Sequence, residues 1–157
     1  MPNITIRTLV PGKPEQVFTH VTGFATTGPA SQKALEQKHG RLISQEDGVY
    51  IFEDDTGDGA TWHCTFDPPH RRIMRAPEAK WADRWDLFEP YGEGTLWTLV
   101  WVPKAKGIQS FTQWFSFQLR GKTRVNQGII MPVVRRFQEG PSGPRRAPRR
   151  GPRRRRG

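Results

Sequence analysis

Between Ala60 and Val102, large aromatic side chains recur at spacings of two and four, within short runs broken by Pro-Pro and Gly-Glu-Gly. This stretch contains five of the six tryptophans in the chain: Trp62, Trp81, Trp85, Trp97 and Trp101. A period of two places alternate side chains on the same face of a β-sheet. The pattern therefore predicts four consecutive antiparallel strands that direct bulky aromatic side chains to one side.

The alternation also predicts which residues share the face that would be buried. Each strand contributes aromatic or apolar side chains, with a single carboxylate among them. The expected inward residues are Trp62, Cys64 and Phe66, then Trp81, Asp83, Trp85 and Leu87, and finally Trp97, Leu99 and Trp101. The question is what covers this face: a packed core, or a pocket that holds a ligand.

The chain before this stretch predicts one strand, two short helices and a hairpin. Residues 3–10 alternate as a strand with one buried face. Pro14 and Gly23 suit the start and the C-cap of a helix. A second helix is expected over residues 30–38, with a thin apolar stripe and light packing. Asp47-Gly48 then favours a type I′ turn between two strands.

After residue 107 the period becomes helical and remains so to about residue 139. Pro132 removes a backbone hydrogen bond, and Gly128 lowers helix propensity, so we expect one long helix with a bend or break between them. This helix is expected to cover the aromatic face. Its side chains expected to face the sheet are Phe111, Phe115, Leu119, Asn126 and Ile129.

The formal charge of +10 resides mainly in the last 17 residues, which contain eight arginines and no acid. The remaining 17 basic residues nearly balance the 15 acidic ones. A segment made of Pro, Gly and Arg cannot bury apolar surface, so residues 141–157 are predicted to be a disordered tail after one domain, residues 1–140. The single cysteine, the absence of a signal-peptide pattern and the absence of a long apolar run predict a cytoplasmic protein.

Three sequence segments together resemble the SRPBCC superfamily of START-like domains, and within it the bacterial polyketide cyclase/dehydrase and lipid-transport-like group. They are PGKPEQVFTHVTGF, GDGATWHCTFDPPHRRIMR and WADRWDLFEPYGEGTLWTLVW. The resemblance covers roughly residues 3–139. It implies an α+β helix-grip fold, in which a seven-stranded curved antiparallel sheet wraps around a long C-terminal helix, with two short helices between strands 1 and 2. It also implies an apolar cavity between the sheet and that helix, without a cofactor.

Three polar residues near the aromatic face are candidates for catalysis. Asp83 lies between two tryptophans, where desolvation would raise its pKa and suit it to proton transfer. His63 lies in a strand but has the outward parity. Arg75 follows the Pro-Pro turn together with Arg71 and Arg72, and one of these arginines could reach a ligand carboxylate or phosphate. Each also has a structural interpretation, as an exposed charge or a partner in an ion pair. The Trp-His-Cys run is no metal motif, because adjacent strand residues point to opposite faces.

Three functions follow from these features. The favoured one is a carrier or sensor of a hydrophobic small molecule, such as a lipid, polyketide or isoprenoid. The second is a cofactor-free cyclase, aromatase or dehydratase that uses Asp83. The third is a module tethered to nucleic acid or to an anionic membrane through Arg145 to Arg156, since clustered arginines bind polyanions without sequence preference. Oligomeric state is left open.

Overall fold

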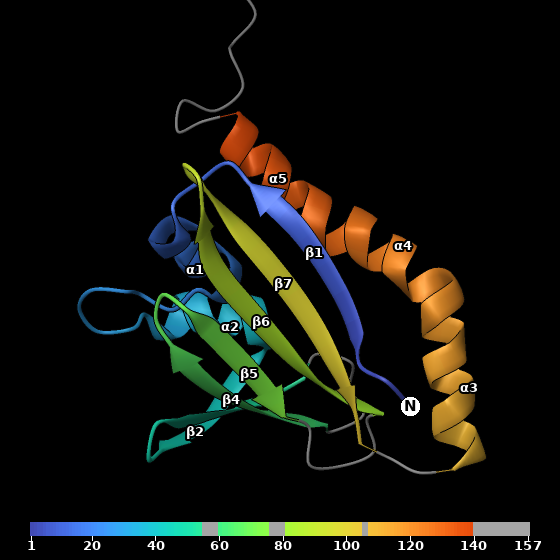
Figure 1. Cartoon of the computed structure of the whole chain (residues 1–157). Helices are drawn as coiled ribbons and strands as arrows, with labels where there is room; N and C mark the ends of the chain where they lie inside the picture. The colour runs from blue at the N-terminus through green and yellow to red at the C-terminus, as the bar shows by residue number, and fades with distance from the viewer. Residues whose placement is uncertain (55–59, 76–80, 105–106, 140–157) are drawn as a thin grey trace, which may run out of the picture.

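A computed structural model describes residues 1–54, 60–75, 81–104 and 107–139. Its centre is an antiparallel sheet of seven strands in the order β1-β7-β6-β5-β4-β3-β2, so the first strand pairs with the last (Figure 1). Each remaining strand pairs with its neighbour in the sequence. The strands are β1 Ile4–Val10, β2 Arg41–Glu46, β3 Val49–Glu53, β4 Thr61–Asp67, β5 Arg71–Arg75, β6 Ala82–Tyr91 and β7 Gly94–Pro103.

The hairpin and the first helix form where their local signals lie. Asp47 and Gly48 both have positive φ, 49° and 75°, as a type I′ turn requires, and they join β2 to β3. Helix α1, Pro14–Thr22, begins at a proline and ends at Gly23 with φ 70°. A Cβ atom at Gly23 would lie 2.4 Å from the carbonyl oxygen of Ala34, so this glycine also permits close approach of the second helix.

Helix α2, Gln32–His39, begins one residue after its N-cap Ser31 and packs more firmly than its sequence suggested. The expectation of light packing is wrong at Leu35 and His39, which are 1% and 6% exposed. Leu35 joins a small cluster with Phe52, Cys64 and Met74, which covers the β3–β5 half of the sheet. Two residues therefore anchor a helix whose overall composition is polar.

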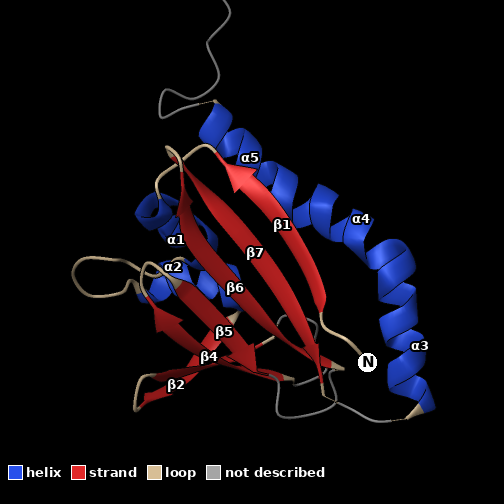
Figure 2. Ribbon diagram, viewed as in Figure 1, coloured by secondary structure: helices blue, strands red, loops and turns tan. Residues whose placement is uncertain are grey.

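The C-terminal helix runs without interruption through α3 Ile108–Ser116, η1 Phe117–Gly121, α4 Lys122–Val125, η2 Asn126–Ile130 and α5 Met131–Gln138. The segments η1 and η2 are π-helical turns, in which a backbone N–H bonds to the carbonyl five residues earlier. Irregularity near Gly128 and Pro132 was predicted; the turn η1 was not. Figure 2 shows α5 lying near β1, whereas α3 points in a different direction beyond the sheet.

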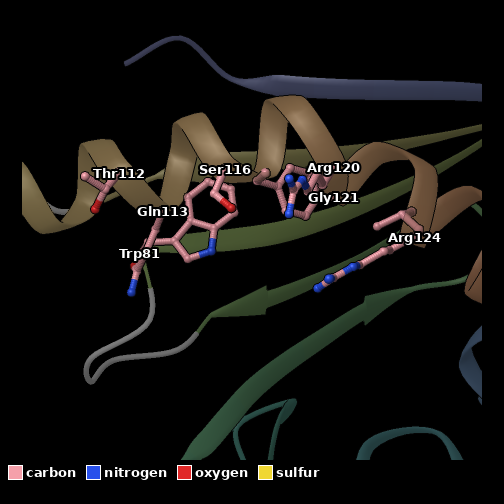
Figure 3. A pocket seen from close by; sticks show the side chains of 9 residues that line it. Trp81, Thr112, Gln113, Ser116, Arg120, Gly121 and Arg124 are labelled. Carbon is pink, nitrogen blue, oxygen red and sulfur yellow. The ribbon is translucent and has the colours of Figure 1, made fainter.

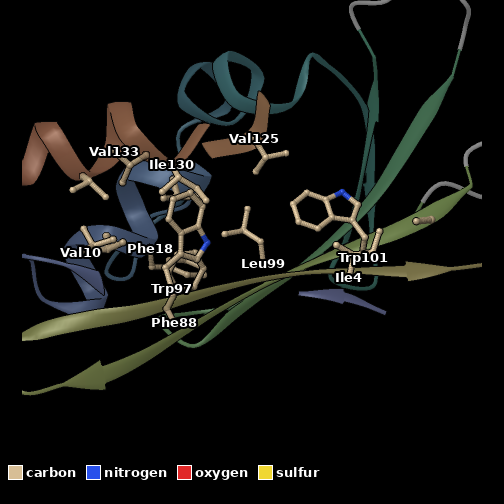
Figure 4. Packing of buried hydrophobic residues seen from close by; sticks show 14 residues of the cluster. Ile4, Val10, Phe18, Phe88, Trp97, Leu99, Trp101, Val125, Ile130 and Val133 are labelled. Carbon is tan, nitrogen blue, oxygen red and sulfur yellow. The ribbon is translucent and has the colours of Figure 1, made fainter. Parts of the chain in front are cut away.

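The main core lies between this helix, α1 and strands β1, β6 and β7. Figure 4 shows Trp97 and Phe88 on the sheet below Phe18 and Ile130. Phe18 meets Phe88 edge-on with ring centroids 5.3 Å apart, and Phe88 stacks on Trp97 at 6.1 Å. The architecture is the α+β helix-grip fold expected from the sequence, with two short helices before β2. No helix in the described residues is long and apolar enough to cross a bilayer.

A candidate ligand cavity beside a buried charged cluster

The inward face of β6 carries charge rather than tryptophan. Ala82, Asp86 and Phe88 are buried, and Arg84 pairs in register with buried Trp101 of β7. The predicted inward orientation of Asp83, Trp85 and Leu87 is therefore wrong. Trp81 lies before the first residue of the strand, so alternation counted from Trp81 assigns the strand to the opposite face.

Asp86 is the centre of this charged cluster and is fully buried. Arg72, from the neighbouring strand β5, donates from Nη2 and Nε to Oδ2 at 2.7 and 3.1 Å. Arg84 donates from Nη2 to Oδ1 at 3.0 Å, and Trp97 Nε1 donates to the same oxygen at 3.1 Å. Four hydrogen bonds therefore satisfy one carboxylate.

The two arginines keep Asp86 ionised. Burial alone would raise the pKa of Asp86, but the charges and hydrogen bonds of Arg72 and Arg84 outweigh burial and lower it to about 2. Burial also lowers the pKa of Arg84, an effect that Asp86 opposes. With two cations against one anion, the cluster retains an excess positive charge.

His39 extends the cluster to helix α2. Its Nδ1 lies 2.8 Å from the carbonyl oxygen of Leu35, and its Nε2 lies 3.1 Å from Arg72 Nη1. Since arginine can only donate, Nε2 accepts and the ring is neutral. Burial, and then the charge of Arg72, lower the pKa of His39 to about 3, so the ring stays neutral at ordinary pH.

A cavity of about 330 Å³ lies beside this cluster, between the sheet and the C-terminal half of the long helix. Its lining brings together α1, α2, β5, β6, β7, the turn η2 and α5, with both apolar and cationic side chains. The lining residues are His20, Val21, Lys38, Arg72, Met74, Arg84, Trp97, Gly128, Ile129, Pro132 and Val133. This volume is at the lower end of the range for small-molecule sites, about 300–1,000 Å³.

The helix turn η2 forms one wall of this cavity. A Cβ atom at Gly128 would meet nothing within 4 Å, so the position is open. Pro132 lacks the N–H that would bond to Gly128, consistent with the irregular backbone here. Nearby cations also act on His20 of α1, because burial and then the charges of Lys38 and Arg136 lower its pKa and favour the neutral ring.

A second, more open pocket of about 610 Å³ lies under the N-terminal half of the helix. Figure 3 shows Trp81 below the helix and Arg124 extending toward the sheet. Phe117 packs between Trp81 and Trp101, with ring centroids 5.2 and 4.9 Å apart. A Cβ atom at Gly121 would lie 2.4 Å from the Phe117 ring, so a glycine is needed for this packing.

The predicted ligand-lining residues fall into four groups. Trp97 lines the cavity beside the charged cluster, and Trp81 lines the open pocket. The predicted residues of β4 and β7 do face inward, but they pack into the core clusters: Trp62, Cys64, Phe66, Leu99 and Trp101. Burial raises the pKa of Cys64 to about 12, so it remains a thiol. Trp85 lies on the opposite face, with Asp83.

The fourth group is the predicted helix stripe, and its orientation is wrong. Phe111, Phe115 and Leu119 are 53%, 51% and 66% exposed, and Asn126 is exposed too. Each π turn adds a residue to a helical turn, so a 3.6-residue period continued through the helix assigns the wrong face. Ile129, by contrast, packs against the core and lines the cavity.

The three candidate catalytic residues lie on the outer face of the sheet and do not line the cavity. Asp83 Oδ1 lies 3.0 Å from Lys104 Nζ on the outer face of the sheet. His63 and Arg75 pair in register on β4 and β5, and Arg75 is exposed. No group of three or more His, Cys, Asp or Glu side chains in the described residues is placed to hold a metal ion. The tail with Arg145 to Arg156 lies outside the described residues.

Sequence reasoning missed Arg84, Asp86 and His39, and it treated Arg72 only as one of three arginines after the Pro-Pro turn. One signal was available: β6 reads Ala-Asp-Arg-Trp-Asp, with opposite charges at positions 84 and 86 on one face. When an acidic and a basic side chain share one face of a largely apolar strand, they are compatible with a buried ion pair as well as with an exposed surface. The contribution of Arg72 depends on the register of β5 against β6, where Arg72 lies opposite Asp86.

No protein-family model matches this chain, and no curated protein matches its sequence. Solved structures do match its fold. StfQ, the di-domain ARO/CYC from the steffimycin biosynthetic pathway, aligns with a TM-score of 0.57 at 11% identity, over 87% of this chain and 50% of that one. DynU16, from the dynemicin biosynthetic locus, gives 0.50 at 16% identity, over 86% and 49%.

TTHA0849 from Thermus thermophilus gives a TM-score of 0.50 at 15% identity, over 90% of this chain and 100% of that one. The chain thus spans about half the length of StfQ and DynU16 and the whole length of TTHA0849. At these identities the likeness shows a common helix-grip fold.

Proposed function

We propose that this protein belongs to the SRPBCC superfamily and binds a small hydrophobic molecule in the cavity between the sheet and the C-terminal helix, as a carrier or sensor. The observation that carries the proposal is the half-open cavity of about 330 Å³, because concave, pre-formed, partly apolar sites of this size are where proteins bind small molecules. Its apolar walls, including Val21, Ile129 and Val133, supply the burial that drives binding.

The test is native mass spectrometry of the freshly purified protein, compared with a variant in which the cavity is filled. Gly128→Phe adds a ring to an exposed residue of the cavity wall, at a position where a Cβ atom meets nothing within 4 Å, and replacing a helical glycine favours the helix. We expect the wild-type protein to carry a bound small molecule that the variant lacks. An equal yield of the same molecule from both proteins would contradict binding in this cavity.

The second candidate is a cofactor-free cyclase, aromatase or dehydratase, and its support is the fold shared with StfQ. The positions of the two candidate carboxylates favour a carrier over an enzyme. Asp83 lies on the other face of the sheet beside Lys104, and Asp86 is held ionised by two arginines, so neither is placed to exchange protons with a molecule in the cavity. Turnover of a polyketide-like substrate that is lost in Asp83→Asn would favour the enzyme instead.

We propose a separate role for the tail: attachment to a polyanion, either nucleic acid or an anionic membrane. Eight arginines without an acid support it, since phosphate binding by clustered arginines needs no defined structure. Deleting residues 141–157 should abolish binding to DNA and to phosphatidylserine vesicles at low salt. Binding that survives the deletion would place the contact on the folded domain.

A further inference from the structure

The cavity that we propose as the ligand site has an unusual charge for an apolar pocket. Three of its lining side chains are cationic, Lys38, Arg72 and Arg84, and none of the described lining residues is acidic. The carboxylate of Asp86 lies next to the cavity and is already bound by two of the three cations. Three cationic side chains therefore surround one carboxylate, and the net positive charge lies at the cavity wall.

The two arginines differ in how far the protein satisfies them. Arg72 makes two hydrogen bonds to Asp86 and one to His39, and its side chain is only 4% exposed. Arg84 makes one hydrogen bond to Asp86, and its side chain is 16% exposed, so part of it is accessible beside the cavity. A guanidinium has five N–H bonds to donate, so Arg84 retains the larger unused capacity.

Arg84 is nevertheless held in place. Its Nη2 is fixed to Asp86 Oδ1 at 3.0 Å, and its Cζ lies 5.7 Å from the centroid of the Trp101 ring, within reach of a cation–π interaction. A donor that is already held in place gains more from a ligand because little ordering is needed. Arg84 is therefore a positioned cationic donor at the cavity wall.

We propose that the ligand of this cavity is an amphipathic carboxylic acid, whose carboxylate binds the guanidinium of Arg84 while its apolar body packs against Val21, Ile129 and Val133. A monoanion matches the single incompletely satisfied guanidinium. At about 30 Å³ per water molecule, the cavity has room for roughly ten non-hydrogen atoms. This inference rests on the proposed function and specifies the chemistry of the ligand.

The test compares three probes of equal length, octanoate, 1-octanol and octylamine, by isothermal titration calorimetry with the full-length protein. A hydrogen bond to a charged group is worth enough to make octanoate bind about tenfold to hundredfold more tightly than 1-octanol. Octylamine should bind most weakly. Equal affinity for the acid and the alcohol, or preference for the amine, would overturn the anion proposal and leave the hydrophobic cavity standing.

Two variants locate the preference. Arg84→Met keeps the apolar stem and removes the guanidinium, so octanoate should fall to the affinity of 1-octanol while 1-octanol is unchanged. Arg7→Met makes the same substitution on the exposed face of β1 and should leave all three affinities as they are. An acid preference that persists in Arg84→Met would assign the anion to another residue and contradict the proposal.

The possible outcomes distinguish a failure of the anion site from a failure of the hydrophobic cavity. If none of the three probes binds the wild-type protein, the proposed hydrophobic cavity fails together with the anion site. If Arg84→Met does not fold, the three affinities of the wild-type protein still show whether the cavity prefers the acid, the alcohol or the amine. Arg84→Lys then serves as a second variant: it retains the charge, loses the guanidinium, and should weaken octanoate without affecting 1-octanol.

Discussion

The two halves of the C-terminal helix bury their apolar residues to different extents. The C-terminal half buries Val125, Ile130, Val133 and Val134 against the sheet and borders the cavity beside Asp86. The N-terminal half packs Trp114 and Phe117 against the core only in part. Its Phe111 and Phe115 are about half exposed and stack on each other, with ring centroids 6.3 Å apart. Apolar content is similar in the two halves, so helical phase rather than composition decides which half forms the core.

Removing the charge at the centre of the buried cluster should have the largest effect. Asp86→Ala leaves two buried arginines without their anion, and breaking such a pair costs about 3–5 kcal/mol. The free energy of unfolding, measured with urea, should fall by this amount. Asp83→Ala, which removes a carboxylate from the outer face of the same strand, should cost about 1 kcal/mol or less. Equal losses would contradict the assignment of faces on β6.

Truncating one residue in each half of the helix tests the comparison directly. Ile130 is 1% exposed, so Ile130→Ala should destabilise the protein by about 2–5 kcal/mol through lost burial and a new cavity. Phe111→Ala removes a larger side chain that is 53% exposed, and its cost should stay within about 1 kcal/mol. The reverse order would show that α3 packs against the sheet in solution.

Lowering the pH should destabilise the protein through His39. Its folded-state pKa of about 3 lies below its ordinary value of 6.5, so the unfolded chain binds a proton that the folded protein does not bind. The stability associated with the neutral ring is complete well above pH 6.5 and declines as the pH falls toward 3. Between pH 6.5 and 5 the loss is about 1.6 kcal/mol, because one full proton corresponds to 1.36 kcal/mol per pH unit and the unfolded imidazole is already half protonated at pH 6.5.

The His39 effect is measured as a difference between two proteins. His39→Gln can still accept from Arg72 but does not titrate, so its unfolding free energy should vary less between pH 6.5 and 5. Asp86 makes no contribution over this range, because its folded-state pKa is about 2 and its effect appears only below pH 4. Identical pH profiles for the variant and the wild type would exclude His39 as the titrating group.

The smallest effect is expected from the exposed stripe of α3. Phe115→Ser replaces a side chain that is 51% exposed, so the free energy of unfolding should change by about 0.5 kcal/mol or less. The solubility of the protein should rise, since an exposed apolar patch promotes association. A loss of stability comparable to that of Ile130→Ala would remove the distinction between the two halves.

The sequence predicts the elements of this fold better than their faces. Strand and turn signals are local: Asp47-Gly48 determines one hairpin, and Gly23 ends one helix. Which face of a strand or helix a side chain occupies depends on its position in the repeat. One irregular residue can reverse that assignment. Trp81 precedes β6 instead of starting it, and η1 adds a residue to the helix, so both alternation and the 3.6-residue period lead to the wrong side.

The charged cluster is harder still to predict. Arg72 and Asp86 are 14 residues apart, and their contact exists because β5 and β6 pair in one register. His39 reaches Arg72 from a helix 33 residues away in the sequence, in a segment of ordinary polar composition. Neither contact leaves a local pattern, whereas the aromatic alternation that dominates the sequence mostly becomes core.

Arginine side-chain NMR gives the most direct test of the central claim, that the cavity binds an acid through Arg84. The guanidinium resonances of Arg84, assigned by their absence in Arg84→Lys, should shift when octanoate is added, and the Nη protons should exchange more slowly with water. Addition of 1-octanol should leave these resonances near their starting positions. A resonance that is unmoved by saturating octanoate, while resonances of Val133 or Ile129 do shift, would show that the acid occupies the cavity without binding Arg84.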